Sequence, residues 1–179
     1  LTLNPRFAEA HNNLGITFYD QGKLPEAINC YHHALALNPN FMEVYNNLGN
    51  ISKQQGKFAE AIDFYQRALL LNPNSAQLHY NLGNAFSDQG KPAEAIDHYQ
   101  RALTCNSNFA EVHNNLGILL EKQGNYSEAL ASYHRALAAN PDFAEAHTNL
   151  GNVFWNQGQL SEALTSFQQA LTLDPNSAQ

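Results

Sequence analysis

The sequence predicts an all-α fold in which antiparallel helical hairpins stack on one another. The first observation behind this prediction is an internal repeat: the tripeptide Asn-Leu-Gly recurs every 34 residues, beginning at Asn13, Asn47, Asn81, Asn115 and Asn149. The second is a glycine that divides each repeat into two segments, at Gly22, Gly56, Gly90, Gly124 and Gly158. Apolar residues in both segments follow the spacing of an α-helix, so each repeat is predicted to be a helix-turn-helix unit.

The repeats account for almost the whole chain. They span residues 8–41, 42–75, 76–109, 110–143 and 144–177, while residues 1–7 match the tail of a preceding repeat and residues 178–179 the start of a following one. We therefore expect a single solenoid over residues 1–179, cut from a longer array.

The first helix of each repeat, helix A, is predicted to bury one apolar stripe. In the second repeat, Val44, Leu48 and Ile51 lie at i, i+4 and i+7, which places them on one face. An asparagine or aspartate followed three residues later by glutamate predicts a capping box at the start of helix A, in the pairs Asn40/Glu43, Asn108/Glu111 and Asp142/Glu145.

The second helix, helix B, carries Ile62, Tyr65, Ala68 and Leu69 on one face of the second repeat. It is predicted to end before Pro73, because proline cannot continue the backbone hydrogen bonds of a helix. The glycine that follows helix A is expected to adopt a positive φ angle.

A second glycine lies inside every helix A, where it costs about 1 kcal/mol relative to alanine. We expect that the missing side chain lets the two helices of a hairpin pack closely while an aromatic residue of helix B fills the space alongside. The glycines are Gly15, Gly49, Gly83, Gly117 and Gly151, and the aromatic residues are Tyr31, Tyr65, Tyr99, Tyr133 and Phe167.

Together these residues resemble the tetratricopeptide repeat, and the resemblance covers essentially the whole chain. The shared pattern is Leu-Gly, an aromatic residue three positions on, and then Ala, aromatic, Ala and Pro. Ser52 and Leu120 depart from it at the first aromatic position, and Ser107 replaces a proline. The resemblance implies a right-handed superhelical solenoid whose concave groove is lined mainly by A helices.

In such a solenoid the second, sixth, ninth and thirteenth residues of helix A would face the groove, and the sixth is asparagine in every repeat. Helix propensity does not explain an exposed asparagine, whereas a primary amide can both donate to and accept from a peptide backbone. We therefore predict a peptide-binding groove formed by Asn13, Asn47, Asn81, Asn115 and Asn149, with Asn50, Asn84 and Asn152 at the ninth position and Tyr19 and Trp155 beside them.

Two interpretations of these residues stay open. The asparagines could instead bond to the backbone of the next repeat and hold the stack together, and Tyr19 and Trp155 could simply pack at an edge. The asparagine column is also similar to that in the tetratricopeptide arm of protein O-linked N-acetylglucosamine transferases, which implies contact with substrate backbones. A carboxylate clamp is disfavoured, because the positions that would need Lys or Arg hold Glu, Gln and Asn.

Charge and composition exclude several other classes. Sixteen acidic and nine basic side chains give a net charge of -7, and no Lys or Arg follows Arg135, which argues against nucleic acid and acidic membrane surfaces. No apolar run approaches the roughly 20 residues that span a bilayer. Cys30 and Cys105 predict neither a zinc site nor a disulfide.

Recurring histidines and glutamates do not indicate a metal site, a cofactor or catalysis. His11, His79, His113 and His147 occupy one position in different repeats, too far apart to share an ion with bonds of about 2 Å. Glutamate in the first turn of helix B is explained by the helix dipole, at Glu26, Glu60, Glu94, Glu128 and Glu162.

The leading hypothesis is a non-enzymatic, cytoplasmic scaffold that binds an extended segment of a partner protein along the groove. One alternative is the substrate-recruiting arm of a larger enzyme, such as an O-GlcNAc-type glycosyltransferase. A second alternative is self-association through end-to-end stacking of repeats, because an interior repeat lacks a polar capping face.

Overall fold

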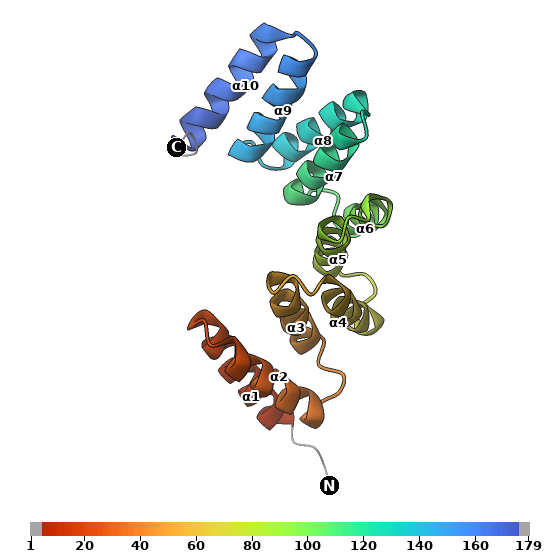
Figure 1. The fold of residues 1–179 in the computed structure, drawn as a ribbon, viewed down its shortest axis with the longest axis vertical. Helices are drawn as coiled ribbons and strands as arrows, with labels where there is room; N and C mark the ends of the chain where they lie inside the picture. Colours follow the sequence, from red (N-terminus) through yellow and green to blue (C-terminus); the bar gives the residue numbers. More distant parts are fainter. Residues whose placement is uncertain (1–4, 176–179) are drawn as a thin grey trace. The chain divides into compact units, whose positions relative to one another are not determined.

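The computed structural model describes residues 5–175, with only the backbone of residues 5 and 6, and in this range it contains ten α-helices and no strand (Figure 1). The residues expected to begin a following repeat, 178–179, lie outside the described residues, as do residues 1–4 of the expected repeat tail. No helix in the described range is long and apolar enough to cross a membrane.

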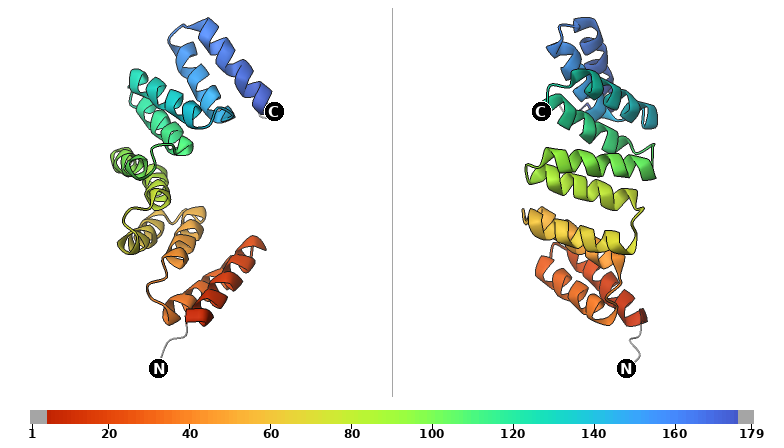
Figure 2. Two further views of the ribbon diagram at one scale, coloured as in Figure 1. Left: turned by 180° about the vertical axis from the view of Figure 1, so that it is seen from behind. Right: turned by 90° about the vertical axis from the view of Figure 1, so that its right-hand side faces the viewer.

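The helices belong to two compact units, Leu1–Ala95 and Ile96–Gln179. The first unit contains α1 (Pro5–Asp20), α2 (Leu24–Leu37), α3 (Met42–Gln54), α4 (Phe58–Leu71) and α5 (Ala76–Asp88), and α6 (Pro92–Cys105) begins in it. The second contains the rest of α6, α7 (Ala110–Lys122), α8 (Tyr126–Ala139), α9 (Ala144–Asn156) and α10 (Leu160–Leu173). The predicted all-α hairpin fold is confirmed, and Figure 2 shows the paired helices from two further sides.

In the first unit each hairpin buries its apolar side against the next. Tyr31 of α2 packs in one buried cluster with Val44 and Leu48 of α3, and these side chains are at most 2% exposed. The same arrangement recurs one repeat later, where Ile62 of α4 packs with Leu82 of α5. Burying a side chain of this size stabilises the fold by about 1.5–3 kcal/mol, so a hairpin depends on its neighbour.

The second unit repeats this packing. Helices α7 and α8 form one hairpin, α9 and α10 form the next, and α8 contacts α9 between them. The buried side chains again come from the predicted stripes, with Val112 on α7, Tyr133 on α8 and Val153 on α9 all fully buried.

The glycine inside helix A is required by a ring of helix B. A Cβ atom placed on Gly49 would lie 2.5 Å from Cε1 of Tyr65, which is far inside van der Waals contact. The same ring covers the glycine in three other hairpins, in the pairs Gly15/Tyr31, Gly117/Tyr133 and Gly151/Phe167. The close approach was expected, but the group that meets the glycine is the aromatic ring itself.

The turn inside each hairpin has the geometry that the second glycine predicts. Gly56 has a φ angle of +72°, and its four counterparts lie between +73° and +80°. Next to it, the Lys57 N–H donates to the carbonyl oxygen of Ser52 at 2.9 Å, which satisfies a carbonyl at the end of α3.

The predicted capping boxes are wrong. Helix α3 begins one residue later than expected, with Phe41 at its N-cap and no side-chain capping bond, and α7 and α9 begin in the same way. The physical reason lies two residues upstream, where Oδ1 of Asn38 accepts the Asn40 N–H at 3.1 Å and keeps Asn40 in a turn. Helix α5, by contrast, has a side-chain cap, in which the Ser75 hydroxyl oxygen accepts the Leu78 N–H at 3.3 Å.

Candidate functional site

The A helices of successive repeats contact one another directly within each unit, α3 with α5 and α7 with α9. This adjacency brings the predicted asparagines of neighbouring repeats onto one surface. Asn13 is exposed, whereas the other four members of the column, Asn47, Asn81, Asn115 and Asn149, are half-buried.

In the first unit the column amides bond across the repeat boundary. Nδ2 of Asn47 donates to Oδ1 of Asn12 at 3.2 Å, and Nδ2 of Asn81 donates to Oδ1 of Asn46 at 2.8 Å. Each bond therefore joins the sixth residue of one helix A to the fifth residue of the preceding one.

The second unit shows the same bond between its own repeats. Nδ2 of Asn149 donates to Oδ1 of Asn114 at 2.9 Å, and Nδ2 of Asn114 donates to a carboxylate oxygen of Glu145 at 3.2 Å. Asn114 is fully buried, so these bonds satisfy an amide that would be costly to leave unpaired.

Column asparagines therefore bond between repeats, as the stacking interpretation expected, but with a different acceptor. The acceptor is a side chain of the preceding repeat, and not the backbone of the next one. These acceptors were not predicted, although each is the first residue of an Asn-Asn dipeptide, at Asn12, Asn46 and Asn114. A primary amide has two N–H donors and an acceptor oxygen, so one donated bond leaves it able to make others.

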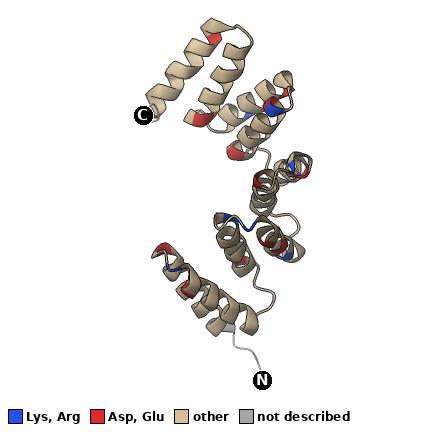
Figure 3. Cartoon of the chain, in the orientation of Figure 1, with Lys and Arg blue, Asp and Glu red and all other residues tan. Residues whose placement is uncertain are grey.

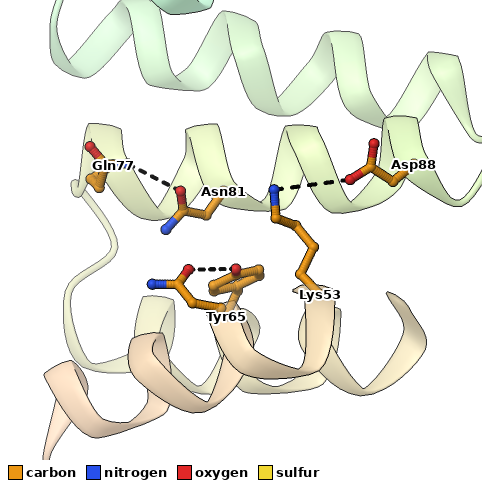
Figure 4. Close-up of polar contacts among 6 residues, drawn as sticks. Lys53, Tyr65, Gln77, Asn81 and Asp88 are labelled. Carbon is orange, nitrogen blue, oxygen red and sulfur yellow. Dashed lines mark hydrogen bonds and ion pairs between the residues drawn. The ribbon is translucent and has the colours of Figure 1, made fainter. Parts of the chain in front are cut away.

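Figure 4 shows the surface between α3 and α5 in the first unit. Nε2 of Gln77 donates to Oδ1 of Asn81 at 3.1 Å, and Lys53 of α3 forms an ion pair of 4.0 Å with Asp88 of α5. The amide column is thus flanked by a neutral amide, Gln77, and by side chains of positive and negative charge, Lys53 and Asp88.

At the ninth position the three predicted asparagines differ. Oδ1 of Asn50 accepts the hydroxyl of Tyr65 at 2.7 Å, which holds this amide in place (Figure 4). Asn84 is half-buried and Asn152 is exposed. The equivalent hydroxyl of Tyr133 donates to Glu121 at 2.9 Å instead.

Three tyrosines buried under this surface have raised pKa values. Burial, together with the nearby charge of Asp20, raises the pKa of Tyr31 to about 12. Burial likewise raises the pKa of Tyr65 and of Tyr133 far above the ordinary value, with the nearby carboxylate of Asp88 adding to the first and a bond to Glu121 to the second. These hydroxyls therefore stay protonated at neutral pH.

The two aromatic residues predicted beside the column are solvent-exposed. Tyr19 is 37% exposed near the end of α1, in the first unit, and Trp155 is 63% exposed near the end of α9, in the second. An exposed indole with this much surface can stack on an apolar side chain of a partner.

Three of the recurring histidines tether the start of a helix A to the turn that ends the preceding repeat. Nε2 of His79, His113 and His147 lies 3.2, 2.9 and 3.0 Å from a backbone carbonyl oxygen six residues earlier. A carbonyl oxygen can only accept, so the ring nitrogen donates, and Tyr45 makes the equivalent bond to Pro39 at 3.0 Å. Within residues 5–175 no group of three or more His, Cys, Asp or Glu side chains is arranged to hold a metal ion.

Comparison with protein-family models identifies the repeat. Models described as tetratricopeptide repeat match residues 40–107 and 114–178, and a model described as TPR repeat matches residues 17–56. The chain is therefore built of tetratricopeptide repeats. A comparison with curated protein sequences finds no match.

Solved structures of such proteins have the same fold. MamA is 27% identical with a TM-score of 0.81, over 92% of this chain and 96% of MamA. YrrB, described as a TPR protein with an unusual peptide-binding site, is 25% identical with a TM-score of 0.73, over 94% and 87%. PilF of Pseudomonas aeruginosa is 25% identical with a TM-score of 0.85, over 98% and 80%.

Proposed function

We propose that the chain is an interaction scaffold that binds an extended segment of a partner protein along the asparagine column. The observation that carries this proposal is that the half-buried amides of Asn47, Asn81 and Asn149 each bond to the preceding helix A, while a primary amide has two N–H donors and an acceptor oxygen and so can make more than this one bond. Their bonds to the preceding repeat fix the amides in position, which lowers the entropy that a partner must remove on binding. The peptide-binding site described for YrrB supports the same class of ligand.

Backbone contacts alone would give weak binding. At about 0.5–1.5 kcal/mol net for each hydrogen bond, a few amides supply only a few kcal/mol, so an affinity in the micromolar range is expected. Tyr19 and Trp155 would add apolar contact at the two places where they are exposed.

The test separates the binding role of the amides from their stacking role. Asn81→Ala removes both a column amide and its bond to Asn46, whereas Asn46→Ala removes the same bond but keeps the column amide. Both variants should lose about 1 kcal/mol of unfolding free energy, measured in urea. Only Asn81→Ala should also weaken the capture of unstructured peptides on an array of varied sequence, by severalfold.

Equal capture by the two variants would contradict the proposal, because the column amide would then serve the stack alone. A larger loss of unfolding free energy in Asn46→Ala than in Asn81→Ala would show that the hydrogen bond between these two side chains does not explain both losses.

A narrower version of the proposal makes the groove the recruiting arm of a larger enzyme, as in an O-GlcNAc-type glycosyltransferase. The repeated asparagines favour it, since backbone contacts would accept substrates of many sequences. The coding sequence on either side of this segment tests it, and a catalytic glycosyltransferase domain there is the expected result.

A second candidate function is self-association, and specific exposed leucines favour it. Leu164 of α10 is 59% exposed, although its counterpart three repeats earlier, Ile62, is only 9% exposed and packs against α5. Leu14 of α1 is 45% exposed although its counterpart Leu82 is fully buried. Two copies stacked head to tail would bury Leu164 against Leu14 in the manner of α4 and α5.

Light scattering over a concentration series tests this candidate. Leu164→Glu or Leu14→Glu should lower the mean mass at high concentration, because each places a charge in the stacked face. Leu70→Glu is the control, since Leu70 is 82% exposed but lies outside that face. A mass that stays at 19.9 kDa at every concentration of the unaltered chain would overturn it.

A further inference from the structure

A second surface lies between B helices in the second unit, away from the asparagine column. Two hollows there, of about 440 and 420 Å³, share Leu103 of α6 and Arg135 of α8 as lining residues. The two hollows therefore adjoin at these side chains, and we refer to them together as the groove. Leu116 and Leu120 of α7, each 8% exposed, line its second half.

Arg135 differs from its counterparts in the two preceding repeats. Arg67 and Arg101 each bond at 2.9 Å to an aspartate one turn earlier in the same helix, Asp63 and Asp97. The residue one turn before Arg135 is Ala131, and among residues 5–175 no carboxylate pairs with Arg135. The guanidinium in this groove is thus available to an external anion, while the same group elsewhere is neutralised.

The two hollows of the groove differ in their charged lining residues. Glu128 lines the second hollow together with the leucines, whereas no acidic residue is among those that line the first. Figure 3 shows that Lys and Arg are absent from α9 and α10 and sparse on the preceding helices, which makes an unpaired arginine distinctive on this unit. An acidic group would be favoured in the first hollow, and apolar groups over the leucines of the second.

We propose that this groove binds a partner polypeptide through one glutamate or aspartate side chain with aliphatic residues beside it. The carboxylate pairs with Arg135, whose planar guanidinium can donate two parallel hydrogen bonds. The aliphatic side chains pack on the half-buried Leu103 and on the small area of Leu116 and Leu120 that remains exposed. This surface is separate from the asparagine column, so a partner could occupy either one without the other.

Residues at equivalent positions in the other repeats suggest the substitutions for the test. Ala131→Asp copies the arrangement of the preceding two repeats and should engage Arg135 without removing it. Arg135→Gln copies the fifth repeat, where Gln169 occupies this position, so the fold should tolerate it. Arg101→Gln is the matched control, because Arg101 is already paired with Asp97.

The probe is a short fluorescent peptide with blocked ends that carries two leucines beside one glutamate, measured by anisotropy. We expect Ala131→Asp and Arg135→Gln each to weaken binding by about tenfold or more, which is the worth of a hydrogen bond to a charged group. Arg101→Gln and Asn81→Ala should leave binding of this peptide unchanged, which separates this surface from the asparagine column. Circular dichroism of every variant establishes that the helices are retained.

Three results would overturn the proposal. The first is equal binding by the unaltered chain and Ala131→Asp, or no binding by the unaltered chain at millimolar concentration. The second is equal binding of a peptide with glutamine in place of glutamate. The third is equal binding of a peptide whose only carboxylate is its C-terminus, which would assign the groove to chain ends instead.

Discussion

At the scale of single residues, contact between a glycine and an aromatic ring sets the spacing inside each hairpin. The ring of Tyr65 lies where the first atom of any side chain at position 49 would be. The cost of glycine in a helix is therefore offset by a fully buried tyrosine, which no other residue at position 49 would allow without a shift of the ring.

This contact predicts that Gly49→Ala destabilises the chain although alanine is the better helix former. Overpacking of a core costs about 1–3 kcal/mol, against about 1 kcal/mol gained from helix propensity. We expect a net loss of up to about 2 kcal/mol in urea unfolding. Ala59→Gly, at an exposed position of α4, is the control for propensity alone, and a gain in stability for Gly49→Ala would contradict the steric account.

The pKa of Tyr31 predicts a loss of stability at alkaline pH. The folded state holds the pKa at about 12 against an ordinary value of 10.0, so below pH 10 the hydroxyl is protonated in both states. From pH 10 to about pH 12 the unfolded chain releases the proton first, and the free energy of unfolding falls as the pH rises.

Tyr31→Phe should reduce this fall, measured by urea unfolding at intervals from pH 9 to pH 11.5. Phe167 occupies the same place in the fifth repeat, so the ring position is preserved. Substitution of the exposed Tyr126 controls for loss of a hydroxyl, and an unchanged alkaline slope in Tyr31→Phe would show that other groups cause the loss.

At the scale of the helices, the starts of the A helices are determined by the turn that precedes them. An asparagine side chain bonds to the backbone two residues later in three of these turns, in the pairs Asn38/Asn40, Asn106/Asn108 and Asn140/Asp142. Because of these bonds, the helix begins one residue later than predicted. A hydrogen bond from a Tyr or His side chain of helix A to a backbone carbonyl oxygen of the turn then holds the turn against the helix.

Helix α5 is the exception and provides a prediction. Ser75→Ala removes its side-chain cap and should cost about 1 kcal/mol in urea unfolding. Asn74→Ala is the matched control, because Asn74 precedes the cap and should change stability by a few tenths of a kcal/mol. A larger loss from Asn74→Ala than from Ser75→Ala would contradict this assignment and place the cap at Asn74, the counterpart of Asn40.

At the scale of the whole molecule, stability should be a sum over hairpins and their nearest neighbours, as in other repeat proteins. Gly49 and Gly151 lie in different units and contact different rings, Tyr65 and Phe167. The losses caused by Gly49→Ala and Gly151→Ala should therefore add to within about 0.5 kcal/mol in the double variant, measured by urea unfolding. A coupling of several kcal/mol would show that the two contacts are not independent.

Much of this architecture could be predicted from residue order, because it rests on local rules. A period of 34 residues, a positive φ at Gly56 and a helix end before Pro73 each depend on a few neighbouring residues. The buried stripe of Val44, Leu48 and Ile51 likewise follows from the geometry of one helix.

The hydrogen-bond partners of the polar side chains could be assigned only from the tertiary structure. Asn81 could reach a guest peptide or another repeat, and its partner Asn46 lies 35 residues earlier, where no rule of sequence spacing assigns a bond. The groove beside Arg135 likewise arises from three helices packed together. Hydrogen bonds between repeats and hollows between helices depend on which surfaces come into contact. Burial of the apolar faces decides those contacts, because the free energy of burying a whole face exceeds that of any single amide hydrogen bond.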